Sequence, residues 1–186
     1  MSDAVNRILE EIEALSEDER VDLFERLKER EAPVAETQIE LPLDFSSEEF
    51  EGRPDYVIIF DGGSHGNPGP GYGSYVLRRT EDGKESLVRL DFGRTMTNNE
   101  AEYEALIAAL QGLTERVESA RRSVSEFSVE IRGDSALVIN QVRGKWKAKD
   151  DRMHKLRNRA RALLAPFGDH RLVQQPREKS VEVLGH

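Results

Sequence analysis

The sequence predicts an α/β domain built on a mixed sheet and preceded by a separate acidic segment. Three short runs rich in β-branched and aromatic residues come first, and helix-like and strand-like runs then alternate. The acidic excess is concentrated in the first 54 residues. Antiparallel strands followed by alternating helices and strands are typical of a mixed sheet with helices packed on it. From residue 55 onward the predicted order is βββαβααβ.

Residues 1–30 are predicted to form a hairpin of two short helices. Apolar residues recur at three- and four-residue spacing in its first half. Ser16 followed by Glu19 is the capping-box pattern that begins a second helix. Residues 31–54 hold three prolines and many acids without periodicity, and they predict a linker. Three partners are open for the apolar faces: each other, the main domain, or a second chain in a homodimer.

The main domain, residues 55–186, begins with three predicted strands. These cover 56–60, 73–79 and 86–92, because each is a short β-branched and aromatic run. The glycine- and proline-rich stretch 62–71 predicts a turn, and EDGK at 81–84 predicts a hairpin turn.

Helices and strands alternate in the rest of the chain. Residues 98–113 predict a helix with alanines and leucines on one face, and 127–132 alternates as a strand. A short helix at 135–142 ends at Gly144. A basic helix at 152–164 is stopped by a proline, a fifth strand covers 171–175, and 181–184 is a final turn.

Composition narrows the possible functions. The absence of cysteine excludes disulfides and thiolate metal sites. No apolar run approaches the roughly 20 residues of a membrane span, so no membrane partner is expected. The acidic N-terminus resembles neither a signal nor a transit peptide, and a cytoplasmic location is expected. The net charge of −9 divides unevenly, since residues 1–54 hold 17 acidic and 6 basic residues, and residues 55–186 hold 19 and 21.

Three acidic residues stand out by their predicted positions. Asp61 follows an apolar strand, Glu102 lies in the first turns of a helix, and Asp134 follows a strand and begins a helix. Acids at such positions can meet at one edge of a sheet. Converging carboxylates repel each other, and a divalent cation removes that penalty. Oxygen ligands without sulfur favour Mg²⁺ or Mn²⁺, of which two ions can act together on a phosphate.

Each acid taken alone has a simpler explanation. Asp134 could be a helix N-cap, Glu102 a helix-start acid favoured by the dipole, and Asp61 a turn residue beside glycines. The glycine-rich run 62–71 could be a plain hairpin loop. Convergence of the three acids in space therefore has to be shown.

Three longer segments carry a family resemblance. FDGGSHGNPGPGYGSYVL (60–77), TNNEAEYEALIAAL (97–110) and GDSALVINQVRGKWKAKD (133–150) resemble the ribonuclease H type I family. The resemblance points to its short bacterial and archaeal reverse-transcriptase-like branch and spans about residues 56–167. It implies a five-stranded mixed sheet of order 3-2-1-4-5 with flanking helices. It also implies an endoribonuclease that hydrolyses the RNA strand of RNA–DNA hybrids by two-metal-ion catalysis, leaving 5′-phosphate and 3′-hydroxyl ends.

The resemblance also implies roles for individual residues. Asp61, Glu102 and Asp134 correspond to the first three members of the family's four-carboxylate metal site. The main chain of Gly62, Gly63 and Ser64 corresponds to groups that face RNA 2′-hydroxyls, the means of telling a hybrid from duplex DNA. The remaining correspondences are the hybrid backbone for Asn67, a DNA-phosphate pocket for Thr97 and Asn98, and the minor groove for Asn99.

A basic stretch follows the third segment. From Arg143 to Arg161 there are nine Lys and Arg against two Asp, a net charge of +7. Lys145 and Lys147 suit contact with phosphates, and Trp146 between them suits stacking on a sugar or base. The simpler explanation is a solvated helix face with Trp146 packed on the domain.

The C-terminus departs from the family. Pro176-Arg177-Glu178 agrees with its pattern, but the following Asn is missing, and so is the Asp that would be the fourth metal ligand. Aligning Val-Glu-x-Leu-Gly with the family's Ala-Asp-x-Leu-Ala makes Glu182 the fourth acid, with Glu178 as the next candidate. No histidine matches the family's catalytic histidine.

Two other functions remain open on the sequence alone. A chain that lacks the fourth acid could be a weak or inactive module that binds hybrids or duplexes. An enzyme of the same fold could act on duplex RNA or on DNA ends. The resemblance favours cleavage of hybrids.

Overall fold

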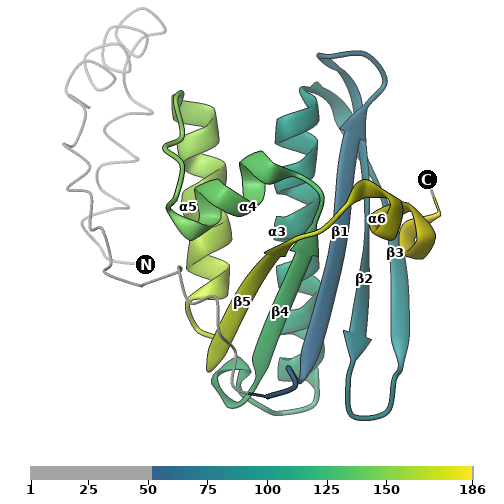
Figure 1. Ribbon diagram of the computed structural model, residues 1–186, viewed down its shortest axis with the longest axis vertical. Helices are drawn as coiled ribbons and strands as arrows, with labels where there is room; N and C mark the ends of the chain where they lie inside the picture. The colour runs from purple at the N-terminus through teal and green to yellow at the C-terminus, as the bar shows by residue number, and fades with distance from the viewer. Residues whose placement is uncertain (1–51, 186) are drawn as a thin grey trace, which may run out of the picture. The chain divides into compact units, whose positions relative to one another are not determined.

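The computed structural model describes residues 52–185, which form one mixed sheet with helices on both faces (Figure 1). The strands are β1 (Tyr56–Ser64), β2 (Gly69–Arg79), β3 (Glu85–Met96), β4 (Ser128–Gly133) and β5 (Asp169–Gln174). The helices are α3 (Asn98–Ser119), α4 (Ala136–Arg143), α5 (Asp151–Leu164) and α6 (Arg177–Leu184), with a 3-10 turn η1 (Val124–Glu126). None of these helices has both the length and the apolar composition that crossing a bilayer requires.

The strand order is β3-β2-β1-β4-β5, which confirms the predicted fold. β1 and β3 pair antiparallel with β2, whereas β1–β4 and β4–β5 are parallel. The first three strands are joined by short hairpins, and each parallel pair is joined through helices, as parallel pairing requires.

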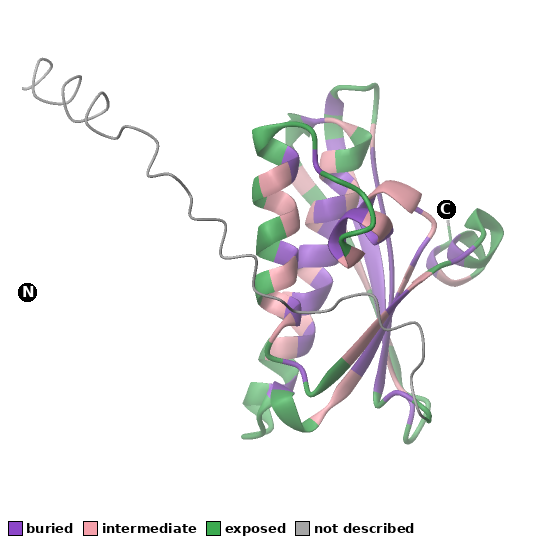
Figure 2. Ribbon diagram, turned by 60° about the vertical axis from the view of Figure 1, so that its left-hand side comes forward, coloured by how far each residue is buried: buried purple, intermediate pink, exposed green. Residues whose placement is uncertain are grey.

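Two layers of helices cover the sheet unequally. Figure 2 shows α3 and α5 on one side of the sheet and α6 on the other. The larger core lies under α3, α4 and α5 and includes Ile58, Phe60, Tyr103 and Leu110. The smaller core is made where Leu184 and Val183 of α6 pack on β1 and β2.

Local sequence explains where the helices begin and end. Thr97 and Glu100 form a capping box at the start of α3. Asp150 caps α5 by accepting a hydrogen bond from the Met153 amide at 3.0 Å. Gly144 ends α4 with a φ of 88°, a left-handed conformation that glycine adopts without strain. The predicted end of this helix at Gly144 is confirmed.

Several predicted boundaries were wrong. β1 does not end at Phe60 but continues to Ser64, so Asp61 lies inside the strand and the turn shrinks to 65–68. The predicted final turn at 181–184 is the second half of α6. The predicted helical hairpin of 1–30, nearly all of the predicted linker and the predicted dimer contact lie outside the described residues and stay predictions.

β1 continues because its glycine half is paired on one side and covered by a helix. Gly62 is opposite Gly73, and Gly63 is opposite Tyr72 of β2. A Cβ placed on Gly62 would lie 2.3 Å from the carbonyl oxygen of Ala101 in α3. The backbone of β1 therefore touches the first turns of α3, which only glycine allows.

This contact predicts that Gly62→Ala destabilises the fold by roughly 1–3 kcal/mol, because an added methyl group forces β1 and α3 apart. The comparison variant is Gly63→Ala, whose Cβ would meet the hydroxyl end of the Tyr72 side chain at 2.7 Å. That side chain can move, so a smaller loss is expected. Urea unfolding of both variants measures the difference; equal losses would show that the backbone contact is not limiting.

Candidate active site

Asp61 lies within β1 with 5% of its surface exposed. Its Oδ1 accepts a hydrogen bond from the Gly62 amide at 2.9 Å. A carboxylate this deeply buried needs hydrogen bonds or cations nearby, because burial penalises the charged form. The strand, not a turn, fixes its position.

Glu102 lies in the second turn of α3, and its Oε2 accepts a hydrogen bond from the Ser135 hydroxyl. The pKa of Glu102 is raised to about 7, first by burial and then by the charges of Asp134 and Asp61, against the lowering effects of Ser135 and Arg177. Both aspartates are thus close enough to act on Glu102.

Asp134 lies between β4 and α4, where the chain leaves the sheet. The N-cap of α4 is Ser135, whose side chain accepts from the Val138 amide at 3.3 Å, so the N-cap explanation of Asp134 was wrong. Asp134 instead forms an ion pair with Arg177 of α6, at 3.5 Å between Oδ2 and Nη1. The Asp134 carboxylate is therefore not used as a helix cap and faces Arg177.

The charges of Asp61 and Asp134 act on Glu102, but the three side chains are not arranged as a metal-ligand cluster. Within residues 52–185, no three Asp, Glu or His side chains are grouped as a metal site. Each carboxylate faces a protein partner, which is Gly62 for Asp61, Ser135 for Glu102 and Arg177 for Asp134. Their chemistry fits a hard divalent cation, because all donors are carboxylate oxygens and two of the acids raise the pKa of the third. Shared coordination requires these side chains to turn toward one another.

The proposed substrate loop is tied to the start of α3. Both the amide and the hydroxyl of Ser64 donate to Asn98 Oδ1, at 2.9 and 2.8 Å. The Asn98 amide in turn donates to Asn67 Oδ1 at 3.2 Å. Asn67, Asn98 and Asn99 are exposed. The structure thus brings together three of the predicted contact residues, namely Ser64, Asn67 and Asn98.

Other predicted contact residues have structural roles. Gly62 and Gly63 are buried, and the Gly62 amide already donates to Asp61. The Thr97 hydroxyl and amide both donate to Glu100 Oε2, at 2.8 and 2.7 Å, as parts of the helix cap. Their predicted contacts with nucleic acid stay predictions.

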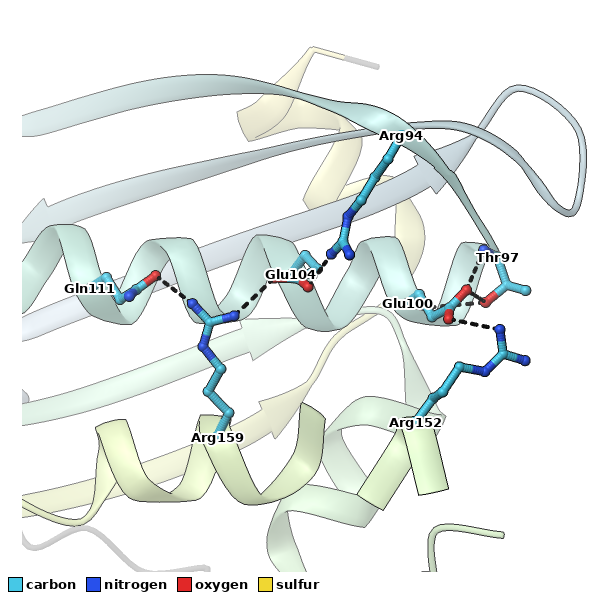
Figure 3. A network of polar contacts seen from close by, with 7 residues as sticks. All are labelled: Arg94, Thr97, Glu100, Glu104, Gln111, Arg152 and Arg159. Atoms are coloured by element: carbon cyan, nitrogen blue, oxygen red, sulfur yellow. Dashed lines mark hydrogen bonds and ion pairs between the residues drawn. The ribbon is translucent and has the colours of Figure 1, made fainter. Parts of the chain in front are cut away.

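Lys145, Trp146 and Lys147 lie in the loop between α4 and α5, and Trp146 is 49% exposed. Lys145, Trp146 and Lys147 therefore do not lie on a helix face, whereas the later part of the basic stretch, from residue 151, does lie on α5. Part of the basic stretch is used internally, as Figure 3 shows. Arg152 pairs with Glu100 at 3.3 Å, and Arg159 pairs with Glu104 at 3.6 Å.

Glu182 lies on the exposed side of α6, whereas Ser180 and Leu184 are buried. Neither Glu182 nor Glu178 is among the main charges that shift the pKa of Glu102. Among the described residues, neither candidate fourth acid belongs to a group of three or more possible ligands.

Known proteins are similar to this chain in sequence and in fold. The family model described as "Reverse transcriptase-like" matches residues 59–183. Ribonuclease H of Escherichia coli is 33% identical over 116 residues, which are 62% of this chain and 71% of that protein. The chain belongs to the ribonuclease H type I family.

Two further family members extend the comparison. Ribonuclease HI of Halobacterium salinarum is 41% identical over 118 residues, which are 63% of this chain and 55% of that protein. The chain thus spans about half the length of that relative. The structure of LC11-RNase H1 in complex with an RNA/DNA hybrid is 30% identical, with a TM-score of 0.57, and the match covers 68% of this chain and 89% of that one.

A cavity of about 310 Å³ lies at the start of β1, lined by Tyr56, Arg79, Val117 and Phe127 among others. None of the predicted site residues lines it.

Two residues that contact the candidate acids, Ser135 and Arg177, were given no role from the sequence. Ser135 had a usable signal, because Ser directly before a helix is a preferred N-cap. Arg177 was noted only as part of the Pro-Arg-Glu pattern. Its pairing with Asp134 depends on where α6 packs, which the sequence does not show.

The raised pKa of Glu102 predicts a pH-dependent stability in metal-free protein. The pKa of an unfolded glutamate is about 4.3, so the folded state binds this proton more tightly. Stability from this group is present at low pH and is lost as the pH rises through about 7, by roughly 3 kcal/mol. Melting temperatures of wild type and Glu102→Gln should therefore agree near pH 4, and Glu102→Gln should melt higher near pH 8.

The control is Glu118→Gln, an exposed acid near the other end of α3. Its difference from wild type should not vary with pH. Mg²⁺ should raise the melting temperature of wild type more than that of Glu102→Gln. If the difference in melting temperature between Glu102→Gln and wild type did not change with pH, the raised pKa of Glu102 would be contradicted.

Proposed function

We propose that this chain is an endoribonuclease that hydrolyses the RNA strand of RNA–DNA hybrids with two Mg²⁺ or Mn²⁺ ions. The products would carry 5′-phosphate and 3′-hydroxyl ends. The observation that carries the proposal is the electrostatic convergence of Asp61, Glu102 and Asp134 at one end of the sheet. Family membership, relatives named ribonuclease H and a similar enzyme crystallised with a hybrid support it.

Asp61, Glu102 and Asp134 would hold the ions. Bound ions supply a water of lowered pKa and positive charge for the oxygens of the scissile phosphate. Ser135 holds the Glu102 carboxylate by a hydrogen bond. Arg177 supplies a cation to the site and keeps Asp134 paired.

The substrate side is formed by two separate segments. The loop at 65–68 is held to α3 by the hydrogen bond from the Asn98 amide to the Asn67 side chain, and both residues are exposed. The loop between α4 and α5 presents Lys145, Trp146 and Lys147. Lysines suit a sliding, sequence-independent contact with phosphates, and the indole adds a stacking surface.

A second candidate function rests on the position of Glu182. Because α6 points this carboxylate to its exposed side, a site with three acids is possible. Such a protein would bind hybrids or duplexes and cleave them weakly or not at all. Metal-dependent cleavage separates the two functions.

Asp134→Asn should lower the cleavage of a labelled hybrid by at least about a hundredfold, because it removes a metal-ligand charge from the site. Binding of the hybrid in EDTA should change by less than about threefold, which is under 1 kcal/mol. Glu118→Gln serves as the control and should cleave at the wild-type rate. Unchanged turnover in Asp134→Asn would refute the proposed mechanism, whereas a wild type that binds without cleaving would favour the second function.

We keep Glu182 as the proposed fourth carboxylate, reaching an ion through water or after a shift of α6. Glu182→Ala should lower the Mg²⁺-dependent rate about tenfold, which corresponds to about 1.4 kcal/mol. The loss should be smaller with Mn²⁺, which tolerates less regular coordination. Glu178→Ala, on the same helix, is the comparison. Equal rates for both variants and wild type with both ions would show that three carboxylates suffice.

A further inference from the structure

The loop between α4 and α5 is exposed on its outer side and fixed on its inner side. Lys145, Trp146 and Lys147 all point to solvent, whereas Ala148 is only 5% exposed. The Trp146 amide donates to the carbonyl of Asn140 in α4 at 3.1 Å. The groups that hold this exposed loop in place must therefore lie on its buried side.

The main anchor is the side chain of Gln141, a buried polar group with 4% of its surface exposed. Its Nε2 donates to the carbonyl of Lys147 at 3.3 Å, and its Oε1 accepts from the Tyr103 hydroxyl at 2.8 Å. A donor at Oε1 fixes the orientation of the amide and directs Nε2 to the loop.

A second anchor is Arg161 of α5. Its guanidinium donates to the carbonyls of Val142 and Gln141, at 2.9 and 3.3 Å. A Cβ on Gly144 would lie 2.8 Å from Arg161 Nη2. The turn that begins the loop is therefore closed over this guanidinium, and α4, α5 and the loop are held as one unit.

The hydrogen bonds of Gln141 also connect the loop to α3, the helix that carries Glu102. Tyr103 is the direct neighbour of Glu102 in α3, and Gln141 joins it to the loop. The element that carries a proposed metal ligand and the element that carries three proposed substrate contacts thus share one buried amide.

We propose that Gln141 is a positioning residue that holds the Lys145–Trp146–Lys147 loop ready for the substrate duplex. It touches neither substrate nor metal and acts by preorganisation, because side chains that are already ordered lose less entropy on binding. The identity of the duplex rests on the proposed function, whereas the anchoring of the loop does not.

Trp146 makes the proposal measurable, since it is the single tryptophan of the chain. In full-length, ligand-free protein, Gln141→Met should increase the quenching of Trp146 fluorescence by acrylamide. Binding of a short RNA–DNA hybrid in EDTA should weaken about tenfold, and KM should rise to match, with kcat at saturating hybrid unchanged. A general loss of folding would not separate KM from kcat in this way.

Gln111→Met is the matched control, because it makes the same change on α3, at a residue whose contact is with Arg159 and not with the loop. It should leave quenching and affinity as in wild type. Tyr103→Phe is the second variant, since it removes the donor to Gln141 but keeps the ring in the core. It should shift quenching and affinity in the same direction by a smaller amount, and it replaces Gln141→Met if that variant does not fold.

The outcomes separate this proposal from the proposed function. Wild-type quenching in both Gln141→Met and Tyr103→Phe would overturn the anchoring. Increased quenching with wild-type hybrid affinity would overturn the role in binding. A wild-type protein that does not cleave hybrids, but whose hybrid affinity depends on Gln141, would defeat the nuclease function and support the positioning role.

Discussion

The approach of β1 to α3 is the constraint on which the site depends. Gly62 lies so close to the Ala101 carbonyl that no side chain fits between strand and helix. Asp61 and Glu102 are the neighbours of these two residues, so backbone contact is what brings one carboxylate from the sheet and one from the helix together. The hairpin pairing of Gly62 with Gly73 then holds the strand straight under the helix. Glycines that are costly for strand formation are used here to shorten the distance between charged groups.

Bringing these charged groups together is unfavourable because the carboxylates are buried and repel each other, and contacts within the fold offset part of this effect. The pKa of Glu102 rises to about 7 because burial and two aspartates act on it, while Ser135 and Arg177 act in the opposite direction. Arg177 comes from α6, which reaches the site only because Leu184 and Val183 pack on the far face of β1 and β2. The small second core thus has an electrostatic consequence, since it positions a cation beside Asp134. A divalent ion would meet the remaining deficit more fully than one arginine can.

Much of this arrangement could be predicted from the sequence, for identifiable reasons. The apolar runs of β1 and α3 and the cap signal at Gly144 are local, and they predicted the element order and many of the boundaries. The end of β1 was predicted wrongly because glycines at 62 and 63 usually signal a turn, whereas pairing with β2 and cover by α3 override that preference. α6 was predicted too short because its polar first turn has little periodicity. The position of Glu182 and the partners of Asp134 depend on tertiary packing, which no local pattern encodes.

The basic stretch after α4 shows how charge counts and structure differ. Its arginines mostly serve the fold: Arg152 and Arg159 pair with acids of α3 (Figure 3), and Arg161 binds main-chain carbonyls of α4. Its lysines at 145, 147, 149 and 155 are all exposed. The planar guanidinium suits fixed, directional partners, whereas the ammonium on a flexible stem suits phosphates that change position as a duplex moves. The stretch therefore divides by residue type into arginines that pair with groups of α3 and α4 and lysines that are exposed. A net charge of +7 overstates how many of its cations a duplex would meet.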